Sequence, residues 1–154
     1  MVKLAQEYFS DSAKKHPDKF AFNFDKNDYW TEEEREELKK KKVLLMSFGE
    51  LENYSNQLAR YLIDDFGVKK RDRIAFMFKK GNFSDSLASI LAILKCGAIY
   101  VPIHHALPPE RIAEILNDSG ARFLICLSIF AEELRKHDSL SSFAFFEMNR
   151  ERSK

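Results

Sequence analysis

The sequence predicts an α/β fold, a partial parallel sheet with covering helices, in one partial domain over residues 1–154. Helical and extended patterns alternate at short intervals from Ser47 onward, which favours a parallel sheet over a helix bundle or a β-sandwich. The extended segments are short apolar runs, as expected for strands buried on both faces. With 154 residues, 45% of them hydrophobic, the chain is long enough to bury one core without disulfide bridges.

The first clear helix is predicted to begin at Ser47 and to end at Gly67. The segment Ser-Phe-Gly-Glu offers a capping box, in which the Ser47 hydroxyl accepts from the Glu50 amide while the Glu50 side chain reaches back. Apolar residues then recur at helical spacing on one face: Leu51, Tyr54, Leu58, Tyr61 and Leu62.

Three further strands and helices follow in alternation. The run Arg73 to Phe78 is too short for a helix and is predicted to be a buried strand, followed by a turn at 79–82. Asn82 or Ser84 is expected to cap the next helix, 85–96, which is apolar almost all the way round and so must be buried. The later predicted elements are a second buried strand at Ile99 to Ile103, a helix from Pro108-Pro109-Glu110 to Ser119-Gly120, a strand at Arg122 to Leu127 and a helix at Ile129 to Lys136.

The two ends of the chain are less regular. Leu4, Tyr8 and Phe9 predict a short amphipathic helix, and Phe20 to Phe24 alternates like a strand. Residues 25–42 are highly charged and are interpreted as a solvated helical excursion, with an acidic or basic docking surface as the alternative. Residues 138–154 are expected to form a less regular tail.

Composition excludes several classes of protein. The 25 basic and 24 acidic residues give a net charge of +1, without the basic excess of a nucleic-acid binder. No apolar stretch approaches the eighteen residues of a membrane span, and the amino terminus does not resemble a signal peptide. Cys96 and Cys126 lie in apolar runs without zinc-ligand spacing, so we expect buried free thiols, a reducing compartment and a cytoplasmic location.

The candidates for chemistry are weak. The five glycines are isolated, so no phosphate-binding glycine loop is present, and no serine lies in a GxSxG elbow. Lys79-Lys80-Gly81-Asn82 follows a predicted strand, where open α/β sheets bind ligands. His104-His105 follows another strand, but no cysteine or carboxylate lies at metal-ligand spacing. We therefore expect no catalytic, cofactor-binding or metal-binding residue in this chain.

Two segments carry a family resemblance. MSFGELENYSNQLARYL (46–62) resembles the first core signature of adenylate-forming enzymes, and LKCGAIYVPI (94–103) resembles the second. GVKKRDRIAFMF, LPPERIAEILNDSGARFLI and HPDKFAF are similar to other family segments and occur in the family's order, so the resemblance covers about residues 4–127. The family comprises acyl-CoA synthetases and nonribosomal peptide synthetase adenylation domains. The sequence Tyr-Val-Pro-Ile in the second segment favours the amino-acid-activating branch.

Three positions depart from the family pattern. Cys96 replaces the favoured alanine, Arg71 stands where glycine usually precedes the aspartate, and His104-His105 replaces the usual Asp-Pro. The change at Arg71 raises the question of whether the turn at 69–72 keeps its geometry. The change at 104–105 predicts a different loop after that strand.

The resemblance implies an amino-terminal fragment of an AMP-forming carboxylate ligase, which adenylates an amino acid or acyl group and then forms a thioester. ATP and Mg²⁺ are implied for the full-length enzyme, but the family's ATP-binding and catalytic segments are not found in this chain, so we expect it to be inactive alone. The expected partner is the remainder of the synthetase or another protein chain. Two alternatives stay open: a stand-alone truncated remnant that binds a partner, and a flavodoxin-like small-molecule binder that uses the loop at 79–82.

Overall fold

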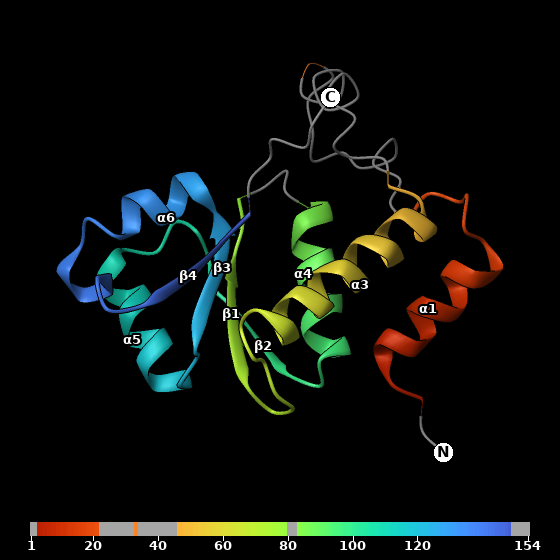
Figure 1. Cartoon of the computed structure of the whole chain (residues 1–154). Helices are drawn as coiled ribbons and strands as arrows, with labels where there is room; N and C mark the ends of the chain where they lie inside the picture. The colour runs from red at the N-terminus through yellow and green to blue at the C-terminus, as the bar shows by residue number, and fades with distance from the viewer. Residues whose placement is uncertain (1–2, 22–32, 34–45, 80–82, 149–154) are drawn as a thin grey trace.

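In a computed structural model, which describes residues 3–21, 33, 46–79 and 83–148, the chain forms a four-stranded sheet covered by helices on both faces (Figure 1). The helices are α1 (Ala5–Lys15), α3 (Phe48–Asp64), α4 (Phe83–Lys95), α5 (Pro109–Ser119) and α6 (Ser128–Leu134), with a 3-10 turn η1 at Asp138–Leu140. The strands are β1 (Arg73–Met77), β2 (Ile99–Pro102), β3 (Phe123–Leu127) and β4 (Ala144–Met148). These elements confirm the predicted α/β class with a parallel sheet.

The strand order is β2-β1-β3-β4, and every pair is parallel. The chain moves from β1 to β2 on one side and then crosses back over β1 to β3 on the other. Because parallel crossovers share one hand, this reversal places α4 and α5 on opposite faces of the sheet. Figure 1 shows the result, with α3 and α4 on one side of the sheet and α5 and α6 on the other.

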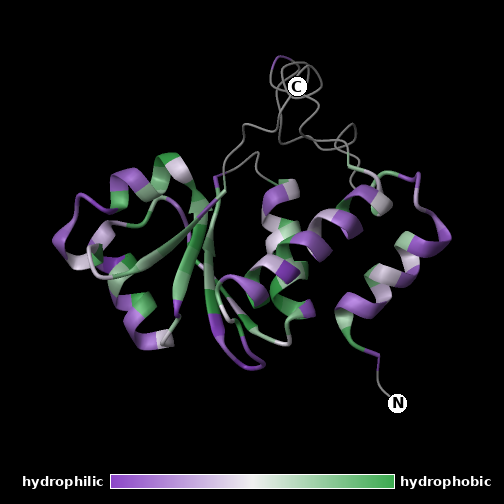
Figure 2. Cartoon of the chain, viewed as in Figure 1, coloured by the Kyte–Doolittle hydropathy of each residue, from purple (hydrophilic) through white to green (hydrophobic). Residues whose placement is uncertain are grey.

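The strands alternate their side chains between two hydrophobic clusters. Ile74 and Phe76 of β1 face α3 and α4, while Ala75 and Met77 face α5 and α6. This alternation is typical of a sheet with both faces covered. Figure 2 shows apolar strands between helices whose outward surfaces are hydrophilic. None of the helices in the described ranges is long and apolar enough to cross a membrane.

The expected cap of the first long helix is confirmed. The Glu50 amide donates to Ser47 Oγ at 3.1 Å, and the Ser47 amide donates to Glu50 Oε2 at 2.8 Å. Ser84 lies inside the first turn of α4 and so does not cap it, while Asn82 lies outside the described residues. Gly120 ends α5 with a left-handed φ of 63°, the conformation that glycine adopts most readily.

Two predictions at the sheet edges are wrong. The strand at Ile99 to Ile103 was expected to be buried, but Ile99 and Tyr100 are 49% and 42% exposed, because no strand among the described residues lies beyond β2. The tail at 138–154, expected to be less regular, contains η1 and the regular strand β4, because Ala144 to Met148 aligns beside β3 in parallel register, while 149–154 lies outside the described residues. Neither outcome is visible in a short apolar run, since the run does not show which strands flank it.

The other terminal predictions meet the structure only in part. The helix predicted at the amino terminus is confirmed as α1, in which Phe9 packs against α3 and α4, while Leu4 and Tyr8 are 56% and 61% exposed. Of the strand predicted at Phe20 to Phe24, Phe20 forms a single antiparallel bridge with Ser47, and 22–24 lies outside the described residues. The charged excursion at 25–42 also lies outside them, apart from the exposed Glu33.

Candidate functional site

The carboxyl edge of the sheet is the first candidate site, because open α/β sheets bind ligands where neighbouring strands send their connections to opposite faces. Here that point lies between β1, which leads to α4, and β3, which leads to α6. Lys79 follows β1, and His104 and His105 follow β2.

The two histidines lie over this edge. Their rings stack with centroids 4.8 Å apart, and the His105 ring lies 6.3 Å from the ring of Phe130 in α6. His104 Nδ1 accepts a hydrogen bond from the Ala106 amide at 3.2 Å. The loop after β2 therefore reaches across the end of β1 to the helix that follows β3.

The described residues of this edge do not gather a cluster of metal ligands. Lys79 is described, but the rest of the predicted loop at 79–82 is not. No group of three or more His, Cys, Asp or Glu side chains in the described ranges could hold a metal ion. We assign no ATP or Mg²⁺ contact to Lys79, His104 or His105, and the prediction that no catalytic residue lies in this chain stays a prediction.

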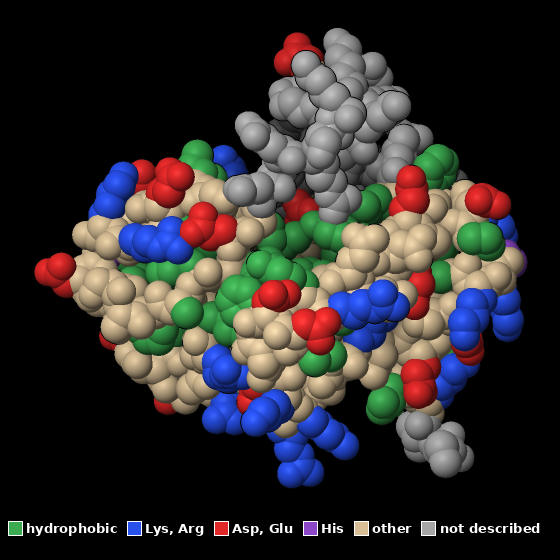
Figure 3. Space-filling view, in the orientation of Figure 1, with side chains coloured by type: hydrophobic (Ala, Val, Ile, Leu, Met, Phe, Trp, Pro, Cys, Tyr) green, Lys and Arg blue, Asp and Glu red, His purple; other side chains and the backbone are tan. Residues whose placement is uncertain are grey.

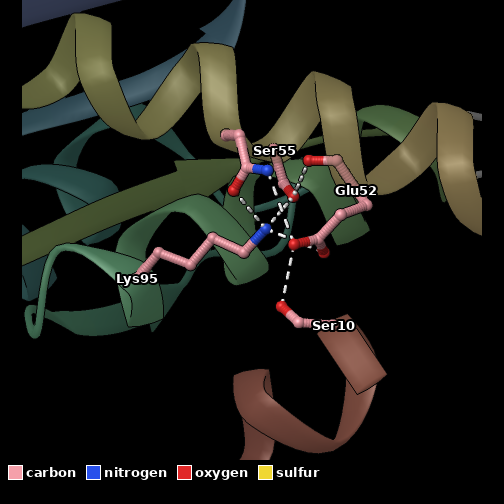
Figure 4. A network of polar contacts seen from close by, with 5 residues as sticks. Ser10, Glu52, Ser55 and Lys95 are labelled. Atoms are coloured by element: carbon pink, nitrogen blue, oxygen red, sulfur yellow. Dashed lines mark hydrogen bonds and ion pairs between the residues drawn. The ribbon is translucent and has the colours of Figure 1, made fainter. Parts of the chain in front are cut away.

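A polar network between α1, α3 and α4 is the most developed cluster of charged side chains (Figure 4). The Lys95 ammonium donates to Ser55 Oγ and to Asn56 Oδ1, both at 2.7 Å, and lies 2.9 Å from Glu52 Oε2. Glu52 Oε1 accepts from Ser10 Oγ at 2.8 Å and from Asn56 Nδ2 at 3.4 Å. Each of the charged groups is thus balanced by several partners.

The network is largely shielded from water. The side chain of Lys95 is 13% exposed and that of Glu52 is 19% exposed. A charge removed from water to this extent is costly unless it is paired and hydrogen-bonded. Glu52, Ser55 and Asn56 together compensate the charge of Lys95. They can do so because a spacing of three or four residues places them on one face of α3.

Sequence reasoning did not identify this network, although both of its halves lie in the two signature segments. Glu52, Ser55 and Asn56 belong to 46–62, and Lys95 belongs to 94–103. The spacing within α3 was a signal for a shared helix face, but nothing in the sequence showed which cation would reach that face. The structure thus connects the two signatures directly through an ion pair.

The amino-terminal edge of the sheet carries a second set of polar contacts. Asp72 Oδ2 accepts from the Lys69 amide at 2.9 Å and from Arg122 Nη1 at 2.7 Å. These two bonds hold the pKa of the Asp72 carboxyl below its usual value. Arg122 also donates to the carbonyls of Gly67 and Phe66 at 3.0 and 3.3 Å, which ties the end of α3 to the start of β3.

The turn at 69–72 keeps the geometry that a glycine would favour. The Asp72 amide donates to the Lys69 carbonyl at 3.0 Å, and Arg71 has a φ of +71°. Arg71 is the only non-glycine residue with positive φ among those described. Arg71 therefore adopts the left-handed conformation that favours glycine, at a cost of about 1 kcal/mol in backbone strain.

A hollow of about 250 Å³ lies along the first half of α3, lined by Met46, Glu50, Asn53, Tyr54 and Gln57. The Tyr54 hydroxyl donates to Asp85 Oδ1 at 3.2 Å, which connects this part of α3 to α4. The two cysteines are free thiols, Cys126 buried and Cys96 half-buried. Burial raises their pKa values to about 12 and about 11, so neither is suited to act as a nucleophile.

Sequence comparisons identify relatives along nearly the whole chain. The profile of the family described as AMP-binding enzyme matches residues 9–151. Nonribosomal peptide synthetase NPS2 of Ceriporiopsis subvermispora is 43% identical over 83 residues, which is 54% of this chain and 3% of that protein. Surfactin synthase subunit 1 of Bacillus subtilis is 32% identical over 123 residues, 80% of this chain and 3% of that protein. A long-chain-fatty-acid–CoA ligase of Salmonella typhimurium is 37% identical over 92 residues, 60% of this chain and 16% of the ligase.

Solved structures share the fold at lower identity. The Klebsiella oxytoca NpsA N-terminal subdomain is 24% identical with a TM-score of 0.61, over 81% of this chain and 28% of that one. VinN in complex with L-aspartate is 19% identical with a TM-score of 0.73, over 95% of this chain and 35% of VinN. The chain thus spans a small part of each relative. It belongs to the AMP-binding, adenylate-forming enzyme family, and its fold matches part of the amino-terminal subdomain of such enzymes.

Proposed function

We propose that this chain supplies the amino-terminal part of an AMP-forming carboxylate ligase that activates an amino acid or another acyl group. In the proposed reaction, a substrate carboxylate oxygen attacks the α-phosphorus of ATP, and the bond from that phosphorus to the bridging oxygen breaks to release pyrophosphate. A thiol sulfur then attacks the acyl carbonyl, loses its proton to a base and displaces AMP. Charge that develops in both steps needs preorganised donors and Mg²⁺.

The single observation that carries this proposal is the family match over residues 9–151. The Lys95–Glu52 pair supports it, because it joins the two signature segments through side chains within those segments. In this proposal the chain's residues act as scaffold, and the groups that contact ATP and Mg²⁺ lie in polypeptide outside this chain. The named relatives include a nonribosomal peptide synthetase and a long-chain-fatty-acid–CoA ligase, so the proposal includes both an amino-acid and a fatty-acid substrate class.

The proposal is tested with a chimera. The segment of the Salmonella typhimurium ligase that matches this chain is replaced by the corresponding residues of this chain, and fatty-acid-dependent exchange of pyrophosphate into ATP is measured. We expect exchange by the chimera and none by the 154-residue chain alone.

The control chimera carries the matching segment of surfactin synthase subunit 1. If the control is active and the chimera with this chain is folded but inactive, the scaffold role is contradicted. Exchange by the isolated chain would contradict the proposal that its chemistry lies elsewhere.

The alternative is a partner-binding module without a ligase role. Exposed aromatic residues such as Tyr61, which is 49% exposed, favour this alternative. An active chimera would contradict this alternative as the only function of the chain. A protein that no longer takes part in a ligase is not expected to keep a scaffold that supports ligase activity.

A further inference from the structure

The turn that enters β1 gathers exposed basic side chains at the amino-terminal edge of the sheet. Lys69, Lys70 and Arg71 lie in the turn and Arg73 is the first residue of β1, and all four are exposed. Arg122 directly precedes β3, its side chain is 45% exposed, and its amide donates to the Arg73 carbonyl at 3.0 Å. Because β1 and β3 are parallel neighbours, the five basic residues share one edge, which we call the basic edge.

Most of these charges are not neutralised by the described part of the chain. Asp72, inside the turn, accepts from Arg122 Nη1 at 2.7 Å and from the Lys69 amide at 2.9 Å, so its carboxylate compensates Arg122. No carboxylate among the described residues forms an ion pair with any of the other four cations. Several uncompensated charges of one sign raise the local potential and attract a surface of opposite charge.

The turn of the basic edge is held in place at some cost. The Arg71 amide donates to the Gly97 carbonyl at 2.9 Å, and Lys70 Cγ lies 3.2 Å from the position that a Cβ on Gly97 would take. Arg71 has a φ of +71°, a conformation that glycine adopts without steric cost. A strained residue that keeps its side chain is a reason to look for a role of that side chain. Here the side chain adds a cation to the turn.

Two exposed isoleucines flank the basic edge. Ile99 begins β2 as the register partner of Arg73 and is 49% exposed. Ile63 lies in the last turn of α3, is 46% exposed, and its carbonyl accepts from the Gly67 amide at 3.1 Å. Cations beside exposed apolar side chains are typical of surfaces that bind membrane interfaces. The cations are attracted to anionic headgroups, and the apolar side chains enter the boundary of the acyl chains.

The shape of the basic edge also fits an extended surface. Figure 3 shows Lys and Arg side chains that project from the lower end of the molecule, where Figure 1 places the turn before β1. The exposed acids of this edge, Asp64, Asp65 and Asp118, lie at the ends of α3 and α5 rather than in the turn. A small ligand is usually held in a pocket, but the hollow described above lies along the first half of α3, away from this edge. The net charge of +1 argues against a nucleic acid.

We propose that the basic edge, together with Ile63 and Ile99, is a peripheral docking surface for an anionic lipid bilayer. The cations of 69–73 lie against lipid phosphates and carboxylates, and the two isoleucines contact the boundary between headgroups and acyl chains. Such binding is reversible and sensitive to salt, because the charges are exposed and few. This inference goes beyond the proposed function, since it concerns where the chain docks and not what it catalyses.

The experiment measures cosedimentation of the 154-residue chain with lipid vesicles. One set of vesicles contains equal parts of phosphatidylserine and phosphatidylcholine, and the other contains phosphatidylcholine alone. At low ionic strength we expect the chain to bind the anionic vesicles at least tenfold more tightly than the neutral ones. Added salt should weaken binding to the anionic vesicles, because it screens exposed charges.

Two pairs of exposed lysines provide matched charge variants. Lys69→Glu with Lys70→Glu reverses two charges of the basic edge, and Lys14→Glu with Lys15→Glu reverses two charges in the last turn of α1. The two double variants have the same net charge. We expect the first to weaken binding at least tenfold and the second less than threefold. Circular dichroism verifies that both retain the fold.

Two exposed isoleucines provide matched apolar variants. Ile99→Ala shortens a side chain of the proposed surface, and Ile129→Ala shortens one in α6 that is 65% exposed. We expect the first to weaken binding about threefold and the second to leave it unchanged. Because neither substitution alters the charge or the turn, this pair tests the docking surface even if the charge-reversed turn does not fold.

Three outcomes overturn the inference: equal binding to the two kinds of vesicle, an equal loss of binding in the two double variants, and no binding at low ionic strength. If soluble polyglutamate binds the basic edge and the anionic vesicles do not, the surface is assigned to an acidic protein instead. None of these measurements requires ATP or turnover. The inference therefore stands or falls separately from the ligase activity, which the chimera tests.

Discussion

The two helical layers that cover the sheet are held by different forces. On one side, α1, α3 and α4 enclose the network of Ser10, Glu52, Asn56 and Lys95 in addition to apolar contacts. On the other side, α5, α6 and η1 meet the sheet through a cluster whose buried members are all apolar.

The difference teaches where this fold demands a specific residue and where it demands only volume. Apolar packing is non-directional, so a side chain of similar size can replace another at small cost. A shielded ion pair with hydrogen bonds depends on particular atoms, and removal of one partner leaves a charge without compensation. The layer that contains the first signature segment and Lys95 of the second is the one that depends on particular atoms.

The largest effect is expected from a cavity in the apolar layer. Leu116 of α5 is fully buried, and Leu116→Ala should lower the free energy of unfolding by about 4 kcal/mol. Urea denaturation measures the loss. Leu116→Met keeps the volume and should cost less than about 1.5 kcal/mol; an equal loss in both variants would show that this layer also requires a specific residue.

In the polar layer, a near-isosteric change should be almost as damaging. Lys95→Met keeps the length of the side chain but leaves Glu52 unpaired, so we expect a loss of about 3 kcal/mol in urea denaturation. Adding Glu52→Gln should recover part of that loss, since the stranded charge is gone. If Lys95→Met costs no more than Leu116→Met, the two layers do not differ in the way described.

The contacts of Asp72 with Lys69 and Arg122 join the two layers at the amino-terminal edge, and they are sensitive to pH. The folded pKa of Asp72 is lowered, so its contribution to stability is present above the unfolded value of about 3.9 and is lost as pH falls through the folded value. Asp72→Asn should cost about 1 kcal/mol at pH 7. That difference should shrink in urea titrations as pH falls below about 3.9, and a difference independent of pH would exclude the carboxylate as its source.

The turn beside this contact should gain stability from glycine. Arg71→Gly relieves the strain of a left-handed conformation, because glycine adopts that conformation without steric cost. We expect the free energy of unfolding to rise by about 0.5 kcal/mol, after the greater entropy of glycine in the unfolded chain is deducted. The midpoint of thermal unfolding measures it. Lys70→Gly, in the same turn, is the matched control and should destabilise slightly.

The reaction rates of the two thiols measure how readily each helical layer opens, without a mutation. Cys126 packs in the apolar layer and Cys96 against the layer of α3 and α4, and burial raises their pKa values to about 12 and about 11. At pH 8 both should react with iodoacetamide roughly a hundredfold more slowly in the folded chain than in urea, with Cys126 the slower. Fast labelling of Cys126 without denaturant would show that the apolar layer opens readily.

Most elements could be predicted from local sequence because their signals are local. The capping box of Ser47 and Glu50 and the stop at Gly120 each depend on residues within one turn of a helix. The family's signature segments likewise indicated the fold and the family from the sequence alone. The prediction that no catalytic residue lies in this chain stays a prediction.

The sequence by itself determined most of the helices and strands between residues 47 and 136, and which faces of α3 and α5 are apolar, because these depend on spacing along the chain. Only the tertiary structure decided that β2 is an exposed edge, that 144–148 is a strand and that Lys95 reaches Glu52. Each of those outcomes joins residues far apart in sequence. A strand becomes an edge, or an ion pair forms, according to which neighbour the folded chain places beside it, and that placement is not encoded within any single segment.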